Sequence, residues 1–177
     1  MYEVGAKVVY PMHGVGLIQT IEEKNILDKK RQYYIMELFH TNMTVMIPVE
    51  MSDKVGLRGV VGMDVINEAY SILKSEATEL DEDWKVRYSS NHGKIKSGSF
   101  VELAEVVRNL FIRNQIKELS NSEKRLFENA LKLMVDEIAF STETEKVEVE
   151  HVITETLEEG LSENKKLNKE LEAKISG

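Results

Sequence analysis

Alternating apolar and polar positions dominate the first fifty residues of the chain. Four segments rich in valine, isoleucine, tyrosine and phenylalanine show this partial alternation, and turn-forming residues separate them; the segments are residues 4–10, 15–24, 31–39 and 43–49. The short links between them favour antiparallel pairing of consecutive strands. Because so few strands would otherwise leave their edges open, we predict a small, strongly curled antiparallel β-barrel of the Tudor or SH3-like kind.

The apolar period becomes helical after Gly62. Residues 63–75 carry a single apolar stripe, and a weaker helix is predicted from about residue 84 to residue 95. Two strongly apolar helices follow, each introduced by a serine and a glutamate spaced as a capping box: Ser99 with Glu102, and Ser120 with Glu123. Their stripes consist of Leu103, Val106, Val107 and Leu110, and of Phe127, Ala130, Leu131, Met134 and Ile138. We therefore predict an α+β protein in which the barrel is followed by an all-α helical domain.

The tail has a thinner apolar pattern. Residues 145–159 predict one more helix, with Gly160 in the position of a C-terminal cap. Beyond it, an apolar residue recurs every four positions in a polar stretch, which fits either a frayed end or a helix that binds a partner: Leu167, Leu171 and Ile175. The expected organisation is a β domain over residues 1–55, a helical domain over 62–159 and an extension over 160–177.

Charge is distributed unevenly along the chain. The net charge of −8 arises mainly in residues 118–177, which contain 8 basic and 15 acidic side chains. Residues 84–117 contain seven basic side chains and two acidic ones, a local balance of +5. A local basic segment can contact a polyanion even when the net charge disfavours the contact. Nucleic acid therefore stays among the candidate partners.

Composition and spacing argue against several other classes of function. The absence of cysteine excludes disulfides and thiolate metal sites, and the apolar runs fall far short of the roughly 20 residues that span a bilayer. We expect a soluble, cytoplasmic protein without membrane contact. The four histidines lack the spacing of a zinc pair, and no nucleophile elbow is present. We expect no enzymatic activity, no metal, no cofactor and no small-molecule ligand.

The only tryptophan of the chain lies in a basic, aromatic cluster. On a helix, Trp84, Arg87 and Tyr88 share one face, and Lys85 adjoins them. A lone tryptophan is ordinarily a core residue. The flanking sequence is polar and the basic balance begins here, however, which fits an exposed ring that inserts into a distorted base step. The two interpretations are equally supported by the sequence.

A second feature lies in the fourth predicted strand. Pro48 cannot donate a hydrogen bond to a neighbouring strand, so it marks a sheet edge or a strand end. Met36 and Met46 are either core residues or part of a soft surface that accepts another protein.

The order and spacing of several motifs resemble the CarD/CdnL family of bacterial transcription regulators. These motifs are VVYPMHGVG, YYIMEL, TVMIPV, VGLRGVVG, DWKVRY, AEVVRNL and SEKRLFENA, and the match spans residues 2 to about 158. The resemblance implies an amino-terminal Tudor-like domain that binds the β subunit of RNA polymerase. It also implies a helical domain that contacts promoter DNA weakly, without sequence specificity, at the upstream edge of the bubble and stabilises the open complex.

The resemblance also implies roles for individual residues. The polymerase-binding residues would be Lys24, Met36, Met46 and Pro48, although some members of the family carry arginine where this chain has Met46. The DNA wedge would be Trp84, with basic support from Lys85, Arg87 and Arg125. Val86 stands where relatives often carry another basic residue. The rival hypothesis is a protein–protein adaptor that binds a partner at the strand edge without touching DNA.

Overall fold

The amino-terminal part of the protein is a five-stranded antiparallel sheet. The computed structural model describes residues 1–78 and 81–176. The strands are β1 (Lys7–Tyr10), β2 (Gly14–Ile26), β3 (Lys29–Leu38), β4 (Thr44–Pro48) and β5 (Arg58–Gly59), in the order β4-β3-β2-β1-β5. The four strands predicted from the alternation are confirmed. A short fifth strand, β5, lies beyond the expected domain boundary at residue 55.

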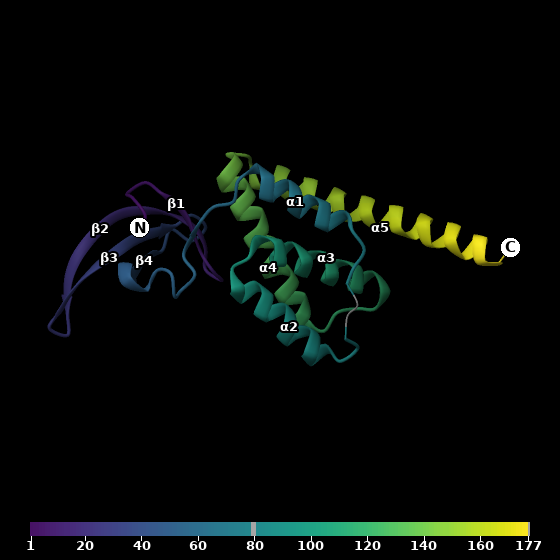
Figure 1. Cartoon of the computed structure of the whole chain (residues 1–177), viewed down its shortest axis with the longest axis horizontal. Helices are drawn as coiled ribbons and strands as arrows, with labels where there is room; N and C mark the ends of the chain where they lie inside the picture. Colours follow the sequence, from purple (N-terminus) through teal and green to yellow (C-terminus); the bar gives the residue numbers. More distant parts are fainter. Residues whose placement is uncertain (79–80, 177) are drawn as a thin grey trace.

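The sheet is open, which corrects the prediction of a closed barrel. β4 pairs only with β3, and the two-residue β5 pairs only with β1, so the sheet has two edges. The long β2–β3 hairpin nevertheless curves strongly away from the helices (Figure 1). Its register shifts between Ile18 and Thr20, a bulge of the kind that increases strand bending and twist. A side chain at Gly16 would collide with the backbone of Glu37, so glycine permits the close approach of β2 and β3 there.

Five helices follow the sheet. They are α1 (Met63–Lys74), α2 (Trp84–Ser97), α3 (Phe100–Ile116), α4 (Asn121–Thr142) and α5 (Lys146–Ser176). α3 and α4 supply most of one buried apolar core, to which α1 and α5 add Ile66, Leu73, Ile153 and Leu157. The apolar stripes that predicted these helices point into this core. α5 runs along α1 and extends past the other helices (Figure 1).

The capping predictions are confirmed in part. Ser120 and Glu123 form the complete capping box at the start of α4. Ser99 accepts a hydrogen bond from the amide of Glu102, but the Glu102 carboxylate accepts from Ser97 rather than returning to the cap.

The assignment of Gly160 as a helix cap was wrong, because α5 continues through it to Ser176. The chain is thus helical beyond residue 160, while the side chains of Leu167, Leu171 and Ile175 lie outside the described residues. Gly160 is buried where a β-carbon would collide with the backbone of Lys74 at the end of α1. It is the packing of α5 on α1, and not the end of a helix, that requires glycine there.

Hydrogen bonds, an ion pair and a small apolar cluster join the sheet to the helices. Glu137 of α4 is 2% exposed and accepts hydrogen bonds from Nη1 and Nη2 of Arg58 at 2.6 and 2.9 Å and from the amide of Val61 at 3.0 Å. Arg58 Nε also donates to the carbonyl oxygen of Gly98 at 2.8 Å. Phe140 packs with Val9 and Val15 in a small apolar cluster that spans the two parts. These contacts fix the direction in which the helical domain faces relative to the sheet.

Candidate nucleic-acid and protein interfaces

Trp84 is the first residue of α2, and the carboxylates of two aspartates that precede it accept hydrogen bonds from nearby backbone amides. The Asp83 carboxylate caps α2 by accepting from the Lys85 amide at 2.9 Å, and the Asp81 carboxylate accepts from the Asp83 amide at 2.9 Å. The indole is 42% exposed and lies outside the buried core of the helical domain. The structure therefore decides against the core interpretation of Trp84. Lys85 Nζ lies 6.0 Å from the centre of the indole ring system.

Aromatic side chains continue from Trp84 along the same stripe of α2. Tyr88 is half-buried, packs against the helical core, and stacks on His92 with ring centres 6.0 Å apart and planes 18° apart. Trp84, Tyr88 and His92 are spaced by four residues, so they follow one line on the helix. Lys85 and, on α4, Arg125 are exposed. We call Trp84, Lys85 and Tyr88 the Trp84 surface; His92 was missed in the sequence, although its spacing from Tyr88 was visible.

Arg87 does not belong to the Trp84 surface, which corrects its assignment as a DNA-contacting residue. Its side chain is 5% exposed and pairs with the fully buried Glu123 of α4, with Nε and Nη2 donating to the two carboxylate oxygens at 2.9 and 3.2 Å. Its third nitrogen, Nη1, donates to the carbonyl oxygens of Asp81 and Glu82. With every nitrogen engaged inside the protein, this guanidinium is not available to a phosphate.

The basic segment of residues 84–117 is less exposed than its composition indicates. Arg108 is also buried, and this burial lowers the pKa of its guanidinium, which donates to Ser75 and Asn109. Lys94 pairs with Glu105 at 2.6 Å. Three of the seven cations that gave the balance of +5 are thus used within the fold. Because these three charges are neutralised or buried, residues 84–117 would attract DNA less strongly than their composition indicates.

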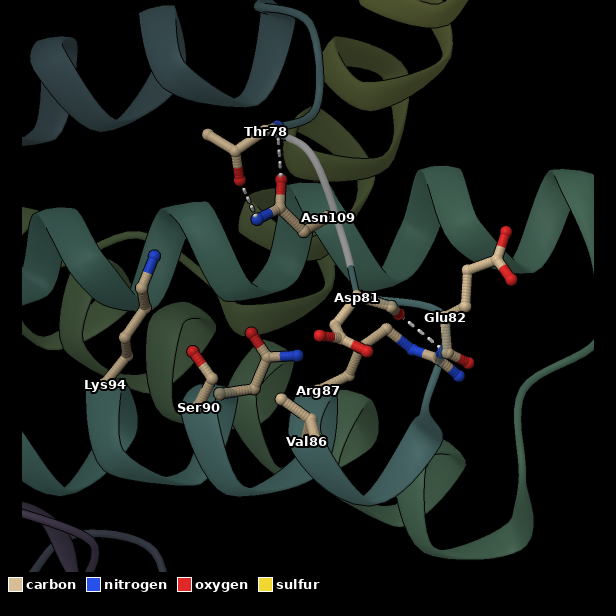
Figure 2. Close-up of a pocket in the computed structure, with 9 residues that line it drawn as sticks. Thr78, Asp81, Glu82, Val86, Arg87, Ser90, Lys94 and Asn109 are labelled. Atoms are coloured by element: carbon tan, nitrogen blue, oxygen red, sulfur yellow. Dashed lines mark hydrogen bonds between the residues drawn. The ribbon is translucent and has the colours of Figure 1, made fainter.

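A hollow of the helical domain lies beside α2 (Figure 2). It measures about 650 Å³ and is lined mainly by polar and charged groups, among them Asp81, Glu82, Ser90 and Lys94. Two of the residues that line it are joined by a hydrogen bond, in which Asn109 Nδ2 donates to Thr78 Oγ1 at 2.8 Å (Figure 2). Ser90 is the serine among the described residues that line it, and no hydrogen bond joins Ser90 to a basic side chain there. Among the described residues no cluster of side chains fits a metal ion, and none of their helices is long and apolar enough to cross a membrane.

Three of the four residues expected to bind the polymerase lie on one face of the sheet, two of them on its edge strand. β4 is an edge strand that ends at Pro48, so both alternatives given for this proline hold, and Met46 is 49% exposed. Met46 pairs with Ile35 and Pro48 with Tyr33 across the β3–β4 ladder, while Lys24 pairs with Arg31 on the other side of β3. Cross-strand partners share a face, so Lys24, Met46 and Pro48 lie on the same outer face of the sheet. We call Met46, Pro48 and the free side of β4 the β4 edge; Lys24 lies on β2, beyond β3.

Met36 lies on the opposite face, which corrects its assignment to this group. It is fully buried with Tyr34 and Ile47 in the core of the sheet. Its alternation was ambiguous in the sequence because Tyr33 and Ile35 on the outer face are as apolar as Tyr34 and Met36 on the inner one.

Two family descriptions match consecutive parts of the chain. Residues 2–61 match the CarD-like/TRCF RID domain, which covers the sheet. Residues 68–154 match the CarD C-terminal domain, which runs from within α1 to within α5. The chain is also 38% identical over 138 residues to the Bacillus subtilis (strain 168) protein named "Putative transcription factor YdeB", across 78% of this chain and 90% of that relative. The chain belongs to the CarD family. This family consists of transcription factors, and the match to a domain shared with transcription-repair coupling factors points to RNA polymerase as the partner of this CarD-family chain.

Proposed function

We propose that this protein binds the β subunit of RNA polymerase through the β4 edge and contacts promoter DNA through the Trp84 surface at the upstream edge of the bubble. The result is stabilisation of the open promoter complex. Its curled sheet would serve as the Tudor-like docking module, and the site of action would be the cytoplasm, where transcription occurs. The observation that carries the proposal is the exposed indole at the start of α2, on a helical domain held firmly to a sheet that has a free edge.

The two surfaces act together because the junction between them is packed. Once the sheet is bound to the polymerase, the helical domain is confined near the DNA, so weak intrinsic DNA affinity is sufficient. The ion pair of Arg58 with Glu137 and the cluster around Phe140 limit the directions in which Trp84 can point. This pre-organisation reduces the entropy lost when DNA is engaged. It also reconciles DNA contact with the net charge of −8.

Trp84 supplies the difference in affinity that shifts the equilibrium towards the open complex. A ligand shifts an equilibrium only by binding one state better than the other. An indole that inserts at a distorted or unstacked base step contacts the melted junction and not the closed duplex. Stacking of one base on an aromatic ring contributes about 1–3 kcal/mol. Few cations surround Trp84, so stacking of the indole would supply most of the stabilisation of the open complex.

The experiment that tests the proposal compares Trp84→Ala with a matched control. We expect Trp84→Ala to leave the fold and polymerase binding unchanged and to shorten the lifetime of the open complex after competitor challenge by about fivefold or more. Val152→Ala is the control, because Val152 lies on α5 and is 41% exposed, close to the value for Trp84. Equal open-complex lifetimes for Trp84→Ala and the wild type would refute the DNA-contacting role.

The adaptor hypothesis is favoured by one observation. Three of the seven cations in the basic segment are engaged within the fold, which leaves less positive surface for DNA than the composition indicates. Crosslinking from position 84 to polymerase on a promoter with a pre-melted bubble separates the two functions. DNA crosslinks at the upstream fork support the proposed function, and crosslinks to protein alone support the adaptor.

A further inference from the structure

The N-terminal half of α2 has little apolar surface with which to hold its position. The buried residues of this helix are Arg87, Asn91 and Ile95, so the single buried aliphatic side chain lies three turns after Trp84. Apolar packing is also non-directional and would leave the start of the helix weakly oriented. In this half of the helix, Tyr88 is half-buried and packs against the core. Polar contacts must therefore set much of the position of Trp84.

Those contacts converge on Arg87. Its Nη1 donates to the carbonyl oxygens of Asp81 and Glu82 at 2.8 and 2.6 Å, in the segment that leads directly into Trp84. Its Nε and Nη2 donate to Glu123 at the start of α4. One planar guanidinium thus connects the segment before α2, α2 itself and α4. Planar, bidentate pairing of arginine with a carboxylate fixes orientation as well as distance.

Glu123 is held rigidly in its turn. Its Oε2 accepts from the amide and hydroxyl groups of Ser120 at 3.2 and 2.9 Å, which completes the capping box of α4. The carboxylate that receives Arg87 is therefore part of a helix terminus and not a mobile side chain.

We propose that Arg87 and Glu123 form a positioning pair that holds the Trp84 indole in the orientation in which it engages DNA. This inference rests on the proposed function. Neither member touches DNA, because Arg87 is 5% exposed and Glu123 is fully buried. The pair acts through Trp84 by holding the first turn of α2 against α4. A lysine at position 87 keeps the charge but cannot reproduce the four hydrogen bonds of a planar guanidinium.

The indole itself reports on the pair, because it is the only tryptophan in the chain. In the free, full-length protein we expect Arg87→Lys and Glu123→Gln to lower the fluorescence anisotropy of Trp84 and to raise its quenching by acrylamide. Circular dichroism and thermal melting establish that each variant is folded at the assay temperature. Lys94→Met is the matched control, because it removes another inter-helix ion pair of α2 further from Trp84. It should leave the Trp84 signal unchanged.

The functional arm measures open-complex lifetimes with purified polymerase. We expect Arg87→Lys to shorten the lifetime by about threefold or more without changing polymerase affinity, as partial loss of a stacking contact predicts. In the Trp84→Ala background, Arg87→Lys should have no further effect, because a positioning residue acts through the group that it positions.

Two results would overturn the inference: the same fold-change from Arg87→Lys in the Trp84→Ala background, or an unchanged Trp84 signal in both folded variants. If Trp84→Ala alone leaves the lifetime unchanged, the proposed function fails. The fluorescence of the free protein then decides the positioning role by itself.

Discussion

Gly160 of α5 lies directly against the backbone of Lys74 at the last residue of α1. The contact lets the long final helix pack closely on the first one, and the Lys74 side chain then pairs with Glu159 at 2.9 Å. α5 adds Val149, Ile153 and Leu157 to the core of the helical domain. The stability of the domain that presents Trp84 therefore depends in part on a glycine in the middle of a helix.

The first prediction reverses the usual effect of a glycine-to-alanine change. Alanine normally stabilises the interior of a helix by about 0.8–1.0 kcal/mol relative to glycine. At Gly160 we expect Ala to destabilise the protein by about 1–3 kcal/mol, because the new methyl group forces α5 away from α1. Urea denaturation followed by circular dichroism measures the change.

Gly93 provides the control for this prediction. It lies inside α2, is exposed, and has open space where a β-carbon would stand. Gly93→Ala should therefore raise the free energy of unfolding by about 0.5–1 kcal/mol. The free energy of unfolding should thus fall in Gly160→Ala and rise in Gly93→Ala. A stabilising Gly160→Ala would show that the contact with Lys74 is not tight.

The second prediction concerns acid and the buried carboxylate of Glu123. Burial by itself would raise the pKa of Glu123, but hydrogen bonds from Arg87 and Ser120 and the charge of Arg87 outweigh it and hold the pKa below its usual range. A carboxylate whose pKa is lower in the folded state stabilises the fold above its unfolded pKa of about 4.3, and this stabilisation is lost as the pH falls through the folded pKa. The free energy of unfolding should decrease with acidification below about pH 4.3.

Glu123→Gln removes this contribution, so we expect the variant to be less stable at neutral pH and to lose less further stability in acid. Denaturant titrations between neutral pH and about pH 3 measure the slope of the free energy of unfolding against pH. Glu118 is the comparison: the hydrogen bond from Lys124 lowers its pKa as well, but its side chain is 79% exposed. Glu118→Gln should change the slope much less. Equal slopes for wild type and Glu123→Gln would contradict the prediction.

Four of the strands and most of the helices could be predicted from the sequence because each buries a face whose period is visible locally, whereas the two-residue β5 has no such pattern. The capping box at Ser120 was predictable for the same reason, since it joins residues three apart. Contacts between distant segments were not. Arg87 and Glu123 lie 36 residues apart, and nothing in the local pattern shows that this arginine faces α4 while Trp84 faces solvent.

Two other errors have the same origin. Met36 and Met46 are alike in the sequence, and only the pairing of β3 with β4 shows that they face opposite sides of the sheet. Gly160 follows a helical pattern as a cap would, and only the position of α1 explains its presence inside a helix. Local periodicity thus locates elements, whereas the roles of individual residues depend on which element packs against them.

The third prediction tests the β4 edge with two methionines of similar exposure. Met46 is 49% exposed on the outer face of β4, and Met43 is 59% exposed in the turn that precedes it. We expect Met46→Glu to weaken binding to the polymerase β subunit by about tenfold or more, because a charged side chain would be buried in an apolar contact. Met43→Glu adds the same charge outside the strand and should change the affinity by less than about threefold.

Surface plasmon resonance with immobilised polymerase measures both affinities, and thermal melting confirms that the variants are folded. Because Met46 points away from the core around Tyr34, the glutamate should leave the melting temperature nearly unchanged. Equal affinities for Met46→Glu and wild type would remove the β4 edge from the interface. A loss of binding in both variants would instead indicate that the contact extends over the β3–β4 turn.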